Sequence, residues 1–132
     1  MKTQHLTATE AIREAHEFAT TSPAGELAEY LLDTIGPRYT AVGLGMSDAR
    51  QVKVWRDEGT APRERAVAER LSLLAQATRA IARSYSGDTA AAFLRASNPD
   101  LEDRSPLLVI ADDDPLLAQQ VVMRAVRAFL EA

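Results

Sequence analysis

The longest stretch of regularly spaced core-type residues lies between Arg63 and Tyr85. Six residues follow one another there at intervals of four and three, namely Val67, Leu71, Leu74, Thr78, Ile81 and Tyr85. This spacing places them on one face of a helix, whereas a strand would need alternation every second residue. The face can pack on other helices of the same chain, or it can form a heptad-like seam with a second copy. Both interpretations require a long helix.

The composition favours helices along the whole chain. Hydrophobic residues make up 46% of the 132 residues and aromatic residues only 5%, while Ala, Leu, Glu and Arg are abundant. The length suits one domain, or one domain with a small appendage. No cysteine is present, which excludes a disulfide framework and thiolate metal sites. We therefore expect an all-α fold.

No export or membrane signal is recognisable in the sequence. The first residues lack the apolar run of a signal peptide, and no segment approaches the ~18 consecutive apolar residues that a membrane-spanning helix needs. We expect a cytoplasmic protein without a membrane partner.

Capping and helix-breaking residues define the first two helices. Thr7 and Glu10 match a capping box before a helix that ends near Thr20. Ser22 is the expected N-cap of the second helix, with Pro23 at its first position. This second helix stops before Gly36 and Pro37. Residues 1–22 are thus predicted to form an N-terminal helical arm.

The stretch GLGMSDARQVKVWRDEG, residues 43–59, suggests a DNA-binding element. A short helix over residues 39–44 ends at Gly45, and Ser47 is the expected cap of the next helix, which Gly59 closes. A helix, a short helix and a third helix after a glycine turn form the layout of a helix-turn-helix. Residues 23–85 are predicted to be this domain together with its long connecting helix.

The third of these helices has a core face and a charged face. Val52 and Trp55 are three residues apart and are predicted to be buried. The outward residues of a recognition helix read bases, and Arg and Gln pair with guanine and adenine. The candidate DNA contacts are therefore Arg50 and Gln51 on bases, Ser47 beside them, and Lys53, Arg56 and Arg38 on phosphates. A plain helical bundle with a charged surface remains the alternative.

The distribution of charge supports the same interpretation. The net charge is −4, yet residues 36–83 carry nine cations and five anions, and the segments on both sides are acidic. A basic centre between acidic ends is consistent with a local polyanion contact, although a surface of mixed charges gives the same count.

The last third of the chain is predicted to form two short helices and one longer helix. Residues 88–96 form a short helix, and Asn98-Pro99 opens a turn. Ser105-Pro106 starts a helix that includes the apolar run LLVIA, and Asp114-Pro115 starts the last helix. An apolar stripe follows along that helix through Leu117, Val121, Val122, Val126, Phe129 and Leu130.

The stretch AAFLRASNPDLEDRSPLLVIA resembles the toxin-binding domain of Xre/MbcA/ParS antitoxins. That family has an aromatic residue on a short helix, then Asn-Pro-x-Leu, then Ser-Pro-Leu before another helix. The matching residues here are Phe93, Asn98, Pro99, Leu101, Ser105, Pro106 and Leu107. The stretch LGMSDARQVKVWRDEGTAPRERAVAERL is similar to the Xre-like part of these antitoxins. The departures are Phe93, where the family often has Trp, Asp103, where it often has Gly, and the acidic DDDP at residues 112–115.

This resemblance implies a fold and a function. The fold is an Xre-like helix-turn-helix bundle followed by a small helical toxin-binding domain at residues 86–132. The function is that of a type II antitoxin, which neutralises a RES-domain toxin that degrades NAD and binds operator DNA to repress its own operon. We expect a homodimer or a larger hetero-oligomer with the toxin. The implied toxin contacts are Asn98, Asp100, Leu101, Asp103, Ser105 and Leu107. A stand-alone helix-turn-helix regulator without a toxin is the alternative.

The sequence gives little support for catalysis or for a cofactor. The two histidines, His5 and His16, are eleven residues apart and do not share a helix face as a metal pair would. Asp112 and Asp113 fall in what is predicted to be a solvated turn, and no phosphate-binding glycine loop follows a strand. We expect a protein that is not an enzyme and holds no metal.

Overall fold

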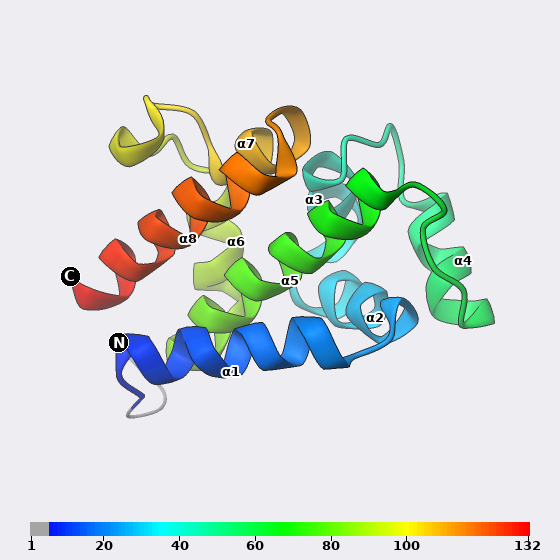
Figure 1. Ribbon diagram of the computed structural model, residues 1–132, viewed down its shortest axis with the longest axis horizontal. Helices are drawn as coiled ribbons and strands as arrows, with labels where there is room; N and C mark the ends of the chain where they lie inside the picture. The colour runs from blue at the N-terminus through cyan, green and yellow to red at the C-terminus, as the bar shows by residue number, and fades with distance from the viewer. Residues whose placement is uncertain (1–5) are drawn as a thin grey trace.

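The computed structural model describes residues 6–132, and all regular secondary structure in this range is helical (Figure 1). The all-α prediction is confirmed. The elements in chain order are α1 (Ala8–Thr21), α2 (Ala24–Thr34), α3 (Gly36–Gly43), α4 (Arg50–Glu58), α5 (Arg65–Ser84), α6 (Gly87–Arg95), the 3-10 helix η1 (Pro99–Leu101), α7 (Pro106–Asp112) and α8 (Pro115–Glu131).

Helix α5 is the centre of the molecule. Figure 1 shows it crossing the bundle, with α1 along one side and α8 along another, and α2, α3, α6 and α7 also pack on it. Its middle is buried almost all round, and Leu71, Leu74, Thr78 and Ile81 are at most 2% exposed. A helix that is buried on every side belongs to a core. The apolar face between Arg63 and Tyr85 therefore packs within the chain. The four middle residues of the possible seam are already buried and cannot pair with a second copy.

The three predicted segments share one hydrophobic core. The core contains Ala15 from the N-terminal arm, Leu31 and Trp55 from the middle segment, and Leu94 and Val126 from the last segment. The boundaries after residues 22 and 85 thus fall between helices but not between separate cores. The start of α1 also meets the end of α8, where an Arg127 amino group donates to the Thr9 hydroxyl at 3.3 Å.

Most helix boundaries follow the predicted caps. The Thr7–Glu10 capping box is present, with the Glu10 amide 3.1 Å from Thr7 Oγ1 and the Thr7 amide 3.0 Å from Glu10 Oε1. Asn98, Ser105 and Asp114 are N-caps, as expected, and each side chain accepts a bond from the backbone that follows it. These caps depend only on residues within one turn, which is why the sequence reveals them.

Two predicted caps are wrong. The Ser22 amide still bonds to the Phe18 carbonyl at 3.1 Å, so Ser22 ends α1 and Pro23 becomes the N-cap of α2. Ser47 lies in the connection between α3 and α4, which extends to Ala49 before helical backbone resumes. The N-cap of α4 is Ala49, and the side chain of the preceding Asp48 accepts a hydrogen bond from the Arg50 amide at 3.0 Å.

Helix α4 is held mainly by α2. A Cβ atom on Gly25 would lie 2.7 Å from the Trp55 carbonyl oxygen, so only glycine allows the two helices to come this close. This contact sets the position of α4 and of the charged face that it presents.

Candidate nucleic-acid interface and partner surface

Helix α4 separates its core residues from its charged residues as the sequence predicts. Val52 is fully buried and Trp55 is 2% exposed, whereas Arg50, Gln51 and Lys53 are exposed. Because Val52 and Trp55 anchor the inner side, the charged residues cannot turn inward without breaking the core.

A shallow groove lies between α3 and α4. It has a volume of about 400 Å³, and its apolar part comes from Ala41, Val42 and Met46. The predicted contacts Arg38, Ser47, Arg50 and Lys53 all line it. Arg38 comes from α3, Ser47 from the connection, and Arg50 and Lys53 from α4. The folded chain thus gathers three cations, a hydroxyl and one carboxylate, that of Asp48, around one groove. The excess of cations suits phosphate oxygens.

Arg50 is held in place by an acidic neighbour. Its Nη2 and Nε atoms lie 3.0 and 3.1 Å from Asp48 Oδ2, and the backbone and side-chain hydrogen bonds from Arg50 hold the pKa of Asp48 below its usual range. The Arg50 side chain is 89% exposed. An ion pair this exposed contributes little to stability and opens easily for a ligand.

Two predicted DNA residues lie apart from this groove. Gln51 lines a different hollow of about 520 Å³ with Val54 and Trp55, because one residue along a helix turns the side chain by about 100°. Arg56 donates to Asp57 Oδ1 at 2.7 Å and faces the acidic residues of α2, which raise its pKa further. Gln51 and Arg56 therefore do not line the groove between α3 and α4, and their role as DNA contacts stays a prediction.

The segment between α6 and α7 forms a tightly bonded loop. The Asn98 amide donates to the Arg104 carbonyl at 3.1 Å, and the Asp103 amide donates to the Asn98 carbonyl at 2.9 Å. Glu102 and Asp103 have φ angles of 58° and 64°, so the chain turns sharply there and exposes both side chains. Asp100 is exposed beside them.

The remaining predicted partner residues support this loop from inside. Leu101 and Leu107 are 5% and 3% exposed, so they belong to the core and do not present a contact surface. The side chains of Asn98 and Ser105 are engaged as caps. Of the six residues, only Asp100 and Asp103 are exposed, because the motif leucines face inward.

An ion pair closes the loop onto α7. Arg104 donates to both carboxylate oxygens of Asp113, at 2.8 and 3.0 Å. Asp112 is exposed, as expected for a solvated turn, whereas the Asp113 side chain is paired with Arg104 and 32% exposed. Paired hydrogen bonds between Arg and a carboxylate are directional and add rigidity to the loop.

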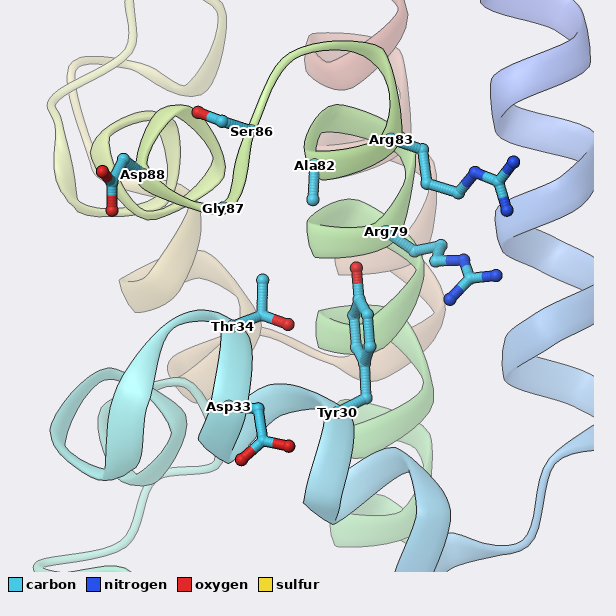
Figure 2. A pocket seen from close by; sticks show the side chains of 9 residues that line it. All are labelled: Tyr30, Asp33, Thr34, Arg79, Ala82, Arg83, Ser86, Gly87 and Asp88. Carbon is cyan, nitrogen blue, oxygen red and sulfur yellow. The ribbon is translucent and has the colours of Figure 1, made fainter. Parts of the chain in front are cut away.

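A polar hollow of about 690 Å³ lies between α2, α5 and the start of α6 (Figure 2). Its two arginines, Arg79 and Arg83, extend toward α1 rather than into the hollow. Arg79 donates to both oxygens of Glu14 at 2.8 and 3.0 Å and lies 4.2 Å above the centre of the Phe18 ring. This cluster joins α1 to the bundle, and Arg79 is not available to a ligand.

Sequence analysis missed the Glu14–Arg79 pair. The two residues are 65 positions apart, so no local spacing connects them. Arg79 lowers the pKa of Glu14 through its hydrogen bonds, and burial raises the pKa of the neighbouring Tyr30.

The described residues give no geometric indication of a metal site. Within residues 6–132, no three His, Cys, Asp or Glu side chains come together as a ligand set. His16 is exposed on α1, and His5 lies outside the described residues. None of the helices in this range combines the length and apolar character needed to cross a bilayer.

Comparison of the chain with protein-family models, with curated proteins and with solved structures gives no match.

Proposed function

We propose that this protein is the antitoxin of a type II toxin–antitoxin system, which neutralises a RES-domain toxin that degrades NAD and represses its own operon. The observation that carries the proposal is the construction of the loop between α6 and α7. The residues that resemble the antitoxin motif are the ones that build it, since Asn98 and Ser105 cap helices and Leu101 and Leu107 anchor it in the core.

The loop has two properties that suit a protein inhibitor. It is stiffened by the Asn98 backbone bonds and by the Arg104–Asp113 pair, and a stiff loop loses little entropy on binding. It also exposes three carboxylates, those of Asp100, Glu102 and Asp103. These carboxylates complement a positive pocket of the kind that binds the phosphates of NAD.

The groove between α3 and α4 supports the proposed operator binding. Arg38, Arg50 and Lys53 surround it, while acidic residues dominate both flanking thirds of the sequence. We propose that α2, α3 and α4 act as the helix-turn-helix, with α4 in the major groove. Operators of this type contain two half-sites, so DNA binding would involve two copies of the chain, alone or with the toxin.

The antitoxin role is tested on the exposed acids of the loop. Glu102→Lys reverses one negative charge, and Asp103→Asn removes another. Lys and Asn adopt the left-handed backbone at these positions about as well as Glu and Asp do. We expect the double variant to bind the RES-domain protein encoded beside it at least tenfold more weakly and to lose rescue of cells that express this toxin. Glu17→Lys combined with Glu26→Lys, at exposed positions of α1 and α2, is the matched control.

Full rescue by the loop variant would remove the loop from the inhibitory surface. The cationic groove also favours the second candidate, a stand-alone regulator. That function would be the correct one if the wild-type chain bound its own promoter but no neighbouring RES-domain protein.

A further inference from the structure

An apolar groove of about 710 Å³ runs between α6 and α8 and ends at η1. The rings of Phe93 and Phe129 meet in it with centroids 5.2 Å apart. Phe93 is 8% exposed, whereas Phe129 is only partly buried. The walls include Ala92 and Ala128, which are both exposed. The groove is thus open to solvent, with aromatic rings in it and short side chains on its walls.

Further apolar side chains lie on the same side of α8 as Ala128. Leu117 and Val121 precede it by eleven and seven residues, and the exposed Arg124 separates them from the groove. Leu117 is 58% exposed and Val121 is partly exposed. The open part of this surface is therefore the groove itself, and an open apolar groove is typical of proteins that bind an amphipathic helix.

The charge at the groove selects among possible occupants. Asp88, in the first turn of α6, and Asp100, on η1, both line it, and its lining within residues 6–132 includes no Lys or Arg. An apolar segment with a cation near each end complements this arrangement.

We infer that the groove between α6 and α8 receives an amphipathic helix of the toxin, with apolar side chains on one face and Lys or Arg residues that face Asp88 and Asp100. This inference rests on the proposed antitoxin function. It adds a second surface that contacts the toxin, beside the acidic loop between α6 and α7. Short alanine walls let the backbone of the incoming helix approach closely, while the two carboxylates set its position along the groove.

A second copy of the chain fits the groove less well. The exposed leucines Leu108, Leu116 and Leu117 are the apolar side chains that a copy could insert. They lie on both sides of the acidic run from Asp112 to Asp114, so insertion would bring these carboxylates toward Asp88 and Asp100. Repulsion between like charges favours a basic partner.

The inference is tested by obstructing the groove in the full-length protein. Ala128→Arg places a long cation in an exposed helical position on the groove wall. We expect it to weaken binding of the RES-domain protein at least tenfold by titration calorimetry, with an unchanged melting temperature. Ala68→Arg, at an exposed position of α5 outside the groove, is the matched control and keeps wild-type affinity.

The carboxylates provide an independent measurement. Asp88→Asn combined with Asp100→Asn keeps size and polarity, and it is expected to lower the affinity and flatten its dependence on salt. If the wild-type chain binds the toxin, and both the Ala128→Arg variant and the Asp88→Asn, Asp100→Asn double variant bind it equally well, the inference about the groove is overturned. The proposed antitoxin function then still stands. A wild-type chain that does not bind the toxin overturns both. If light scattering shows that the wild-type chain is a homodimer and that Ala128→Arg dissociates it, the groove binds a second copy and the inference is overturned.

Discussion

At the scale of single residues, two buried or half-buried side chains determine where the outer helices lie. Trp55 fixes α4 against α2, at the point where Gly25 allows the backbones to meet. Arg79 fixes α1 by binding Glu14 and by stacking on Phe18. Each residue acts at one contact, so each can be tested by one substitution.

Trp55→Ala is expected to lower the free energy of unfolding by roughly 3–5 kcal/mol, because it leaves a cavity in a close-packed core. Urea denaturation followed by circular dichroism measures this loss. In the wild-type chain the indole is 2% exposed, so iodide should hardly quench its fluorescence. Strong quenching in the free protein would contradict the packing described here.

Glu14 is expected to make the stability depend on pH. Arg79 lowers its pKa in the folded state below the ordinary 4.5, so its contribution is present above pH 4.5 and is lost as the pH falls through the lowered value. We expect the wild type to be more stable than Glu14→Gln at pH 7, with a difference that shrinks below pH 4.5. Urea titrations across this range measure the difference.

Glu17→Gln is the control for this experiment, since Glu17 is exposed on the same helix. A difference between wild type and Glu14→Gln that stays constant down to pH 2 would mean that the pair with Arg79 does not hold α1.

At the scale of secondary-structure elements, α4 combines two roles on opposite sides. Its inner side is part of the core, and its outer side meets α3 at the groove lined by Arg38, Arg50 and Lys53. Arg56, on a further side of the helix, pairs with Asp57 and also faces the acidic residues of α2. Only one side of α4 is therefore suited to a polyanion.

Substitutions on that side are expected to affect DNA binding differently. Arg50→Ala should cost ~1–3 kcal/mol and reduce discrimination between operator and other DNA, if Arg50 contacts a base. Lys53→Ala should weaken binding to all sequences and reduce the salt dependence by about one ion, because a phosphate contact releases counterions. Gel-shift titrations at several salt concentrations measure both effects.

Arg56→Ala is the matched control on the same helix, because Arg56 does not line the groove and faces the acidic residues of α2. Unchanged operator binding by Arg50→Ala and Lys53→Ala would show that α4 does not contact DNA.

At the scale of the whole molecule, α5 connects the two proposed surfaces. Helices α2 and α3 pack on it next to the cationic groove, and α6, α7 and α8 pack on it next to the acidic loop. A chain that ended at Tyr85 would uncover core residues of α5 such as Leu74 and Ile81. The two proposed activities must therefore be separated by surface substitutions, since truncation would remove more than a third of the buried hydrophobic residues.

Local features of the sequence determined the helical class, the long central helix and most of the caps. The Thr7–Glu10 box, the Asn98, Ser105 and Asp114 caps and the inward side of α4 all follow from residues within two turns. Capping hydrogen bonds and helix periodicity operate over these short spans, so neighbouring residues are enough to predict them.

Only the tertiary structure decided which distant side chains meet. It joined Glu14 to Arg79, brought Arg38 to Arg50 and Lys53, and buried the motif residues Leu101 and Leu107. It also left the groove between α6 and α8 uncovered. These outcomes depend on how amphipathic helices pack around α5, and that packing is set by the complementarity of whole helix surfaces rather than by residues close in sequence.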